Sequence, residues 1–436
     1  MEKMKKFFYL DEKKLGYLMV APAILLISIV VIWPILRSFY NSMFDYRLND
    51  PNRSQLMMES TVDLERYVDN IFYLENEFEK ISEIEENSSK VNNHIENIRM
   101  YHEKFVNSGN TNEKVKQVQE KIDSFTPVRD NNLKYVKIED DLAREYQKEL
   151  DELSTYVESL IEKELIEADK FGNSIGIIDA QSETILESNF IGFKNYSRYL
   201  RDSRMWAALS NTAFFTIISV SLELIFGLII ALLVNRSFKG RGIVRASVLI
   251  PWAIPTAVSA MMWKFLLDGQ NGIISYIFSS LNFIPNMSWA LSTSSGGMFS
   301  VILADVWKTT PYMALLILAG LQTIDKSLYE ASSVDGASSW QQFWSITLPM
   351  LKGPILVALL FRTLDAFRVF DLIYVLTGGG PSNATESISV YAYKTLFAQQ
   401  NFGAGSVLSI FVFIFVAIIS IVYIKFIGSE LFKDKT

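Results

Sequence analysis

The chain has 436 residues, half of them apolar and none of them cysteine, and its charges are segregated along the sequence. Residues 49–190 hold 32 of the 48 acids and 16 of the 41 bases, a net charge of −16, whereas all eight tryptophans lie elsewhere. This segregation excludes a purely soluble enzyme. It also argues against a nucleic-acid binder, because the hydrophilic segment would repel phosphates. The lack of cysteine excludes disulfides, thiolate metal sites and cysteine nucleophiles.

Six apolar stretches are long enough to cross a bilayer, which takes roughly 20 residues in a helix. They predict an all-α membrane protein with transmembrane helices at 16–37, 208–234, 244–267, 298–321, 353–376 and 405–428. The first stretch follows several lysines, as a signal peptide would. Its apolar run is too long for one and no small-residue cleavage site follows, so we expect a retained anchor.

Basic residues in the short connecting segments predict how the chain crosses the membrane, because cytoplasmic loops carry an excess of Lys and Arg. Bases gather before the first span, after the second and after the last, at Lys3, Lys5, Lys6, Lys13, Lys14, Arg236, Lys239, Arg241, Lys425, Lys433 and Lys435. Residues 268–297 have none, and 377–404 have only Lys394. We therefore expect both termini in the cytoplasm and the acidic segment 49–190 outside the cell.

The acidic segment 49–190 has the apolar spacing of long helices. The first apolar stripe repeats every seven residues at Ile84, Val91, Ile98 and Phe105, with Ile81 and Ile95 between these positions. The second stripe alternates steps of four and three residues, at Tyr146, Leu150, Leu153, Val157 and Leu160. Such spacing is typical of coiled coils, and turn residues predict breaks at 107–112 and near Pro127. We expect an antiparallel helical hairpin or a three-helix bundle, closed by a β-rich return over 175–185. The alternative is that segment 49–190 serves only as a spacer.

The expected cytoplasmic loop 325–350 has the pattern of two short helices. Asp325 or Ser327 can cap a helix through Glu330, and Gly336 permits the left-handed turn that ends it. A second, amphipathic helix follows, with an apolar side made of Trp340, Phe343, Trp344 and Ile346. Its aromatic residues either lie in the lipid interface or contact a partner.

This loop resembles a known family motif. Glu330-Ala331-Ser332-Ser333-Val334-Asp335-Gly336-Ala337, followed after eight residues by Ile346-Thr347-Leu348-Pro349, is similar to the EAA loop of ABC importer permeases, with Ser332 where Ala is commonest. Other stretches resemble the carbohydrate-uptake (maltose-type) branch, at 192–196, 211–212, 250–255, 305–308, 365–371 and 376–381. The resemblance covers 1–48 and 190–436, whereas ordinary members have only a short loop where this chain has 49–190.

The resemblance implies the six-helix fold of type I importer permeases, a bacterial plasma-membrane location and the uptake of a carbohydrate such as an oligosaccharide. It also implies that the loop couples the spans to a cytoplasmic ATPase through Glu330, Ala331, Asp335, Gly336, Ile346, Leu348 and Pro349. The chain has no Gly-x-x-x-x-Gly-Lys-Ser/Thr pattern, so we expect neither an enzyme nor a cofactor of its own. Expected partners are a second permease subunit, two ATPase subunits that bind the ATP, an extracellular substrate-binding lipoprotein, the carbohydrate and membrane lipid, but no nucleic acid.

Charged residues inside spans are costly and usually face a cavity or a partner. The resemblance places sugar contacts at Trp252, Thr256, Asp305, Lys308, Thr309, Tyr312, Arg362 and Asp365, and at Ala366 and Val369, whose side chains cannot hydrogen-bond. Pro255 predicts a broken helix, the kind of element at which transporters place substrate. The alternative for these charges is an ion-pair network that packs the spans, and Glu223 is expected to make a packing hydrogen bond. No catalytic residue and no metal site is predicted.

Two other functions stay open. One is a permease for a non-sugar solute such as glycerol phosphate or a polyamine, since three bases could hold an anion although three acids roughly neutralise them: Lys308, Arg362, Arg368, Asp305, Asp365 and Asp371. The other is a membrane-anchored coiled-coil sensor or adhesin, which needs only one or two spans and no EAA loop.

Overall fold

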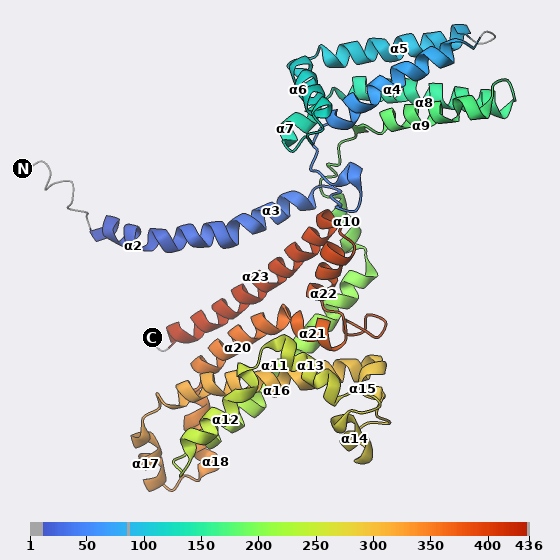
Figure 1. Cartoon of the computed structure of the whole chain (residues 1–436). Coiled ribbons are helices and arrows are strands. Elements are labelled where there is room, and N and C mark those ends of the chain that lie inside the picture. Colours follow the sequence, from blue (N-terminus) through green and yellow to red (C-terminus); the bar gives the residue numbers. More distant parts are fainter. Residues whose placement is uncertain (1–11, 85–87, 434–436) are drawn as a thin grey trace, which may run out of the picture. The chain divides into compact units, whose positions relative to one another are not determined.

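The computed structural model describes residues 12–84 and 88–433, which form two compact units (Figure 1). The first unit joins the residues up to Ser42 with those from Phe193 onward, and the second is Met43–Gly192. Lys3, Lys5, Lys6 and Lys435, which contributed to the predicted orientation, lie outside the described residues.

The first unit is built of helices. Its α-helices are α2 (Glu12–Ile27), α3 (Trp33–Ser42), α10 (Lys194–Leu200), α11 (Ser203–Asn235), α12 (Arg241–Ala253), α13 (Thr256–Leu266), α14 (Ile273–Ser280), α15 (Trp289–Ser292), α16 (Ser294–Leu321), α17 (Lys326–Val334), α18 (Ser339–Gln342), α19 (Leu348–Met350), α20 (Lys352–Phe367), α21 (Asp371–Leu376), α22 (Ile388–Tyr393) and α23 (Phe402–Lys433). Single π-helical turns at Ser28–Ile32, Phe343–Thr347 and Lys394–Ala398 connect some of them.

Four to six of the described helical segments can cross a membrane. Four single helices are long and apolar enough: Gly16–Ser42, Ser203–Asn235, Ser294–Leu321 and Phe402–Phe426. Two bent pairs qualify if each pair is one span: α12 with α13, bent by 90°, and Ser339–Met350 with α20, bent by 62°. A polytopic helical membrane protein is therefore confirmed, and the count of six remains a prediction.

Two of the predicted spans are interrupted. The break at Pro255 is confirmed: α12 ends at Ala253, and Ile254 is extended (φ −73°, ψ 132°), as expected of a residue before proline. The prediction of one helix over 353–376 was wrong, because α20 ends at Phe367 and α21 begins only at Asp371. At this break the backbone of Phe370 lies outside the helical region (φ −132°). The break was not visible in the sequence because an apolar run continues after Asp371.

The first unit packs around α11 and α16, which lie side by side (Figure 1). A Cβ on Gly227 of α11 would lie 2.8 Å from Cγ of Met313 on α16, so only a glycine allows this close approach. Helix α20 contacts both α11 and α16, and α21 contacts α13. These contacts bring the ends of α12, α13, α20 and α21 close to the middle of α16.

The second unit combines helices with a small antiparallel sheet. Its elements are β1 (Thr61–Asp63), α4 (Leu64–Ser82), α5 (Ser88–Val106), α6 (Thr111–Asp123), α7 (Asn131–Lys134), β2 (Tyr135–Lys137), α8 (Asp140–Glu162), α9 (Ala168–Ser182) and β3 (Ile185–Leu186). The strand order is β2–β1–β3, with Val62 opposite Val136 on one side and Ile185 on the other. The all-α prediction was therefore wrong for this sheet, although the chain is mostly helical.

The second unit is neither a hairpin nor a three-helix bundle. Its long helices contact one another in the closed order α4–α9–α8–α5–α4, and α6 packs on α4. Both apolar stripes are buried except at Ile84, which lies in the turn after α4. The apolar positions with seven-residue spacing continue across that turn from α4 into α5. The sequence therefore predicted fewer helices than the structure has.

The predicted β-rich return over 175–185 was also wrong, because most of it belongs to α9. The buried residues of α9 are Phe171, Ser174, Ile178 and Gln181, at the three- and four-residue spacing of a helix. Only Ile185 and Leu186 form strand β3.

Candidate functional site

The predicted substrate-path residues gather at one cavity of the first unit. The cavity has a volume of about 480 Å³ and is lined by Trp252, Thr256, Asp305, Lys308, Thr309, Arg362, Asp365, Ala366, Arg368, Val369, Phe370, Asp371 and Leu372. Seven of the eight predicted residues are in this lining. The eighth, Tyr312, stacks on Trp252 with ring centroids 5.6 Å apart and an interplanar angle of 15°.

The break between α12 and α13 forms one wall of the cavity. Trp252 lies in the last turn of α12 and is 47% exposed, and Thr256 begins α13. Nζ of Lys308 on α16 donates to the carbonyl oxygen of Trp252 at 3.5 Å. A cation at this position suits the negative end of a helix dipole, so Lys308 supports the broken end of α12.

A buried ion-pair network contributes to the lining of the cavity and joins three helices. Arg362 of α20 donates through Nε and Nη2 to Glu223 of α11, and through Nη2 also to Asp305 of α16. Its Nη1 lies 3.4 Å from Asp365. Glu223 accepts a further hydrogen bond from Thr309 at 2.7 Å. Since Arg362 is 2% exposed, its guanidinium mainly holds helices together.

Glu223 is the residue of this site whose role the sequence understated. It was expected to make a packing hydrogen bond, yet it is fully buried and forms an ion pair with Arg362. The two positions are 139 apart in the sequence, so no local spacing pattern links them. The only hint was an acid inside a strongly apolar helix.

The exposed polar groups of the cavity differ from this buried network. The Asp365 side chain is 62% exposed and the Arg368 side chain 64%, and the two lie 3.8 Å apart. Together with the Trp252–Tyr312 stack, they offer an aromatic face beside a balanced pair of charges.

Loop 325–350 folds as two helical limbs tied to each other. Asp325 caps α17 by accepting from the backbone N–H of Ser327 at 2.9 Å, and Gly336 has φ +81°. Ser338 and Gln341 form a capping box at α18. The predicted second helix is present as one helical segment, Ser339–Met350, in which a π-helical turn at Phe343–Thr347 lies between α18 and α19.

Side chains between the limbs keep the loop in shape. The Gln342 side-chain amide donates to the hydroxyl oxygens of Ser332 and Ser333, both at 2.9 Å, and the hydroxyls of Tyr329 and Thr347 lie 2.9 Å apart. Four of the predicted coupling residues lie in the first limb and its turn and are exposed: Glu330, Ala331, Asp335 and Gly336. The other three lie in the second limb and are half-buried or exposed: Ile346, Leu348 and Pro349. The loop thus presents a preformed surface that includes Trp340, 69% exposed.

Another buried carboxylate fastens the segment after α21. Glu386 is fully buried and accepts from Nε of Arg204 at 2.8 Å and from Nζ of Lys394 at 2.8 Å. Burial favours a higher pKa for Glu386, but the hydrogen bonds from these two bases outweigh it and lower the pKa below its ordinary value. Glu386 therefore fixes the start of α22 against α11.

The long apolar helices and the polar cavity among them define a polytopic membrane protein. Residues 223–428 match the family described as binding-protein-dependent transport system inner membrane component. The chain is 49% identical over 241 residues to the trehalose/maltose transport system permease protein MalF of Thermococcus litoralis, a match that covers 55% of this chain and 81% of the relative. It is 44% identical over 243 residues to the trehalose transport system permease protein SugA of Mycobacterium tuberculosis, covering 56% of this chain and 76% of the relative.

A solved structure shows the same fold. The fold matches a bacterial ABC transporter involved in the import of the acidic polysaccharide alginate, with a TM-score of 0.50, 23% identity, and coverage of 55% of this chain and 84% of the other. The chain belongs to the family of binding-protein-dependent transport system inner membrane components, which are permease subunits of ABC importers. The predicted family is confirmed, and with it a location in the plasma membrane.

Proposed function

We propose that the chain is one of two permease subunits of an ATP-driven importer for a neutral carbohydrate. The observation that carries this proposal is the stacking of Tyr312 on Trp252, which lines a polar cavity. Aromatic faces pack against the C–H faces of sugars, and carboxylates accept hydrogen bonds from their hydroxyls. The names of the relatives, which are trehalose and maltose permeases, support the same substrate class.

The charges of the cavity favour a neutral substrate over an anion. Arg362 is committed to Glu223 and Asp305, and Lys308 lies beside the Trp252 carbonyl. Arg368, the exposed base, lies near Asp365. An anionic solute would have to displace one of these partners, whereas a hydroxyl-rich solute would not. The volume of about 480 Å³ lies within the 300–1,000 Å³ usual for small-molecule sites.

Loop 325–350 is the proposed coupling element to a cytoplasmic ATPase. Its two limbs are cross-linked by Gln342 and offer exposed Trp340 and Glu330, so a partner could bind it at low ordering cost. Movement of the loop would pass to the cavity through α20, which follows α19 directly in the chain. The proposal includes two ATPase subunits that bind the ATP and a second permease subunit that completes the pore.

The second unit is the proposed docking arm for an extracellular substrate-binding lipoprotein. With both termini in the cytoplasm, as the basic residues predict, residues 49–190 lie outside the cell. Their net charge of −16 would raise the encounter rate with a basic patch on the partner. The buried core of α4, α5, α8 and α9 would keep the arm rigid.

Deletion of the arm tests its role. The ends of the second unit meet in an antiparallel stem, in which the N–H of Asp45 donates to the carbonyl of Asn189 and that of Ile191 to Met43, both at 2.8 Å. A short Gly/Ser linker can therefore replace 49–190. We expect a raised half-saturation for uptake, with normal assembly and a stronger effect at low salt. Unchanged uptake at low sugar over a range of salt would contradict the docking role.

The carbohydrate proposal is tested by replacing the aromatic stack in cells that express the complete importer. Trp252→Ala should lower uptake of labelled maltose or trehalose about tenfold or more, and Trp252→Phe should restore part of it. Trp206→Ala is the matched control, because Trp206 is similarly exposed at 49% and is not among the residues that line the cavity. Equal losses in both alanine variants would refute a substrate contact at Trp252.

A further inference from the structure

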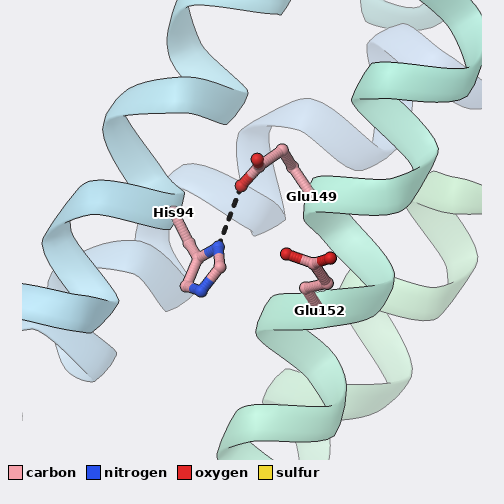
Figure 2. Close-up of side chains that lie close together, drawn as sticks. All are labelled: His94, Glu149 and Glu152. Atoms are coloured by element: carbon pink, nitrogen blue, oxygen red, sulfur yellow. Dashed lines mark hydrogen bonds and ion pairs between the residues drawn. The ribbon is translucent and has the colours of Figure 1, made fainter.

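The second unit brings its first histidine against two acids of another helix. Nδ1 of His94 on α5 lies 2.9 Å from a carboxylate oxygen of Glu149 on α8. Figure 2 shows Glu152, one turn further along α8, with its carboxylate turned toward the same imidazole. One possible ligand atom from each of the three side chains lies within 4.8 Å of the others.

The helices that carry these three residues are fixed by the core of the unit. On α5, His94 is flanked by buried Val91 and Ile95. On α8, Glu149 and Glu152 are flanked by buried Leu150 and Leu153. The two helices contact each other directly. Side chains on rigid, packed helices hold their relative positions better than side chains on loops.

The charges at this position favour an additional cation. Glu149 and Glu152 are three residues apart on one helix face, where like charges repel. The base that pairs with Glu152 is Lys148, at 3.5 Å and with a side chain 72% exposed, and such exposed pairs contribute little. The Glu149 side chain is only 16% exposed, so solvent screens its charge less.

We propose that His94, Glu149 and Glu152 bind a divalent transition-metal ion of the Zn²⁺ type. One imidazole nitrogen with two carboxylates suits Zn²⁺ better than Ca²⁺ or Mg²⁺, which prefer oxygen ligands alone. Bonds of about 2.0–2.2 Å in a tetrahedral site place ligand atoms roughly 3.3–3.6 Å apart. A rotamer change of exposed Glu152 closes the remaining gap, and water takes the fourth position. The ion would clip α5 to α8.

This site could not be predicted from the sequence. His94 and Glu149 are 55 positions apart, and the sequence contains no His/Cys spacing pattern that predicts a metal ligand. The fold alone brings the two helices together.

The test is metal binding by the tag-free, full-length chain in detergent after chelator treatment. The chain has no cysteine and only two histidines, so background binding is low. Isothermal titration with Zn²⁺ and the absorption spectrum of bound Co²⁺ are measured for the wild type, His94→Gln and Glu152→Gln. Two matched controls change one residue of the same helices: His102→Gln on α5 and Glu158→Gln on α8.

We expect one equivalent of Zn²⁺ in the wild type, about tenfold or more weaker binding in His94→Gln and Glu152→Gln, and wild-type affinity in the controls. Ca²⁺ and Mg²⁺ should not compete at equal concentration. The proposal is overturned if the wild type binds no more Zn²⁺ than His94→Gln. It is also overturned if either control weakens binding as much, or if Ca²⁺ displaces the ion. Circular dichroism of each variant checks that the helices remain folded.

Discussion

Replacing Arg362 by methionine should destabilise the first unit far more than the loss of one surface charge. Arg362→Met leaves Glu223, fully buried, and Asp305, 5% exposed, without their main countercharge. Removing one partner of a buried pair costs about 3–5 kcal/mol, which corresponds to roughly a hundredfold or more in the unfolding equilibrium. The matched control is Arg368→Met. That side chain is 64% exposed and lies 3.8 Å from Asp365, and exposed pairs contribute about 0–1 kcal/mol.

Unfolding in mixed detergent and SDS micelles, followed by tryptophan fluorescence, measures the free energy of unfolding of each variant. The triple variant Arg362→Met, Glu223→Gln, Asp305→Asn should be more stable than Arg362→Met alone, because it leaves neither Glu223 nor Asp305 as a buried carboxylate without its countercharge. A cost for Arg362→Met no larger than for Arg368→Met would refute the network as a helix anchor. A triple variant less stable than the single one would refute the electrostatic explanation.

Three further predictions concern transport, coupling and topology. Asp365→Ala should lower sugar uptake several-fold with normal assembly, because Asp365 is an exposed carboxylate of the cavity; failed assembly would instead indicate a packing role. Gly336→Val should leave membrane insertion intact but abolish stimulation of the partner ATPase, since φ +81° strains a β-branched residue; normal stimulation and transport would count against the coupling role. In this cysteine-free chain, a cysteine at Ser108 should react with an impermeant reagent on intact cells and one at Ser338 should not, and the reverse result would overturn the proposed orientation.

Local features of the fold could be predicted from the sequence. The lengths of apolar runs located α11, α16 and α23 closely, and Pro255 located the break between α12 and α13, because each signal is confined to one segment. The cap at Asp325 and the turn at Gly336 were predicted for the same reason.

Features that depend on contacts between distant segments were missed. The partnership of Glu223 with Arg362 requires α11 and α20 to pack together, which no local spacing reveals. Turn residues did not mark the end of α4, so one apolar stripe concealed two helices. The β-rich return predicted over 175–185 is mostly helix α9; the isoleucines of this segment favour strands, whereas its buried residues follow a helical period. The substrate-path set came from family resemblance rather than from spacing, and its convergence on one cavity needed the structure.

Transport by purified components tests the central proposal most directly. The chain would be reconstituted in proteoliposomes with its second permease, its ATPase and its binding protein, and uptake of labelled maltose and trehalose would be followed with and without ATP. We predict saturable, ATP-dependent uptake of a neutral sugar that glycerol 3-phosphate and spermidine do not inhibit, and that Trp252→Ala reduces with ATPase assembly unchanged. Uptake of the charged solutes without uptake of any neutral sugar would contradict the account.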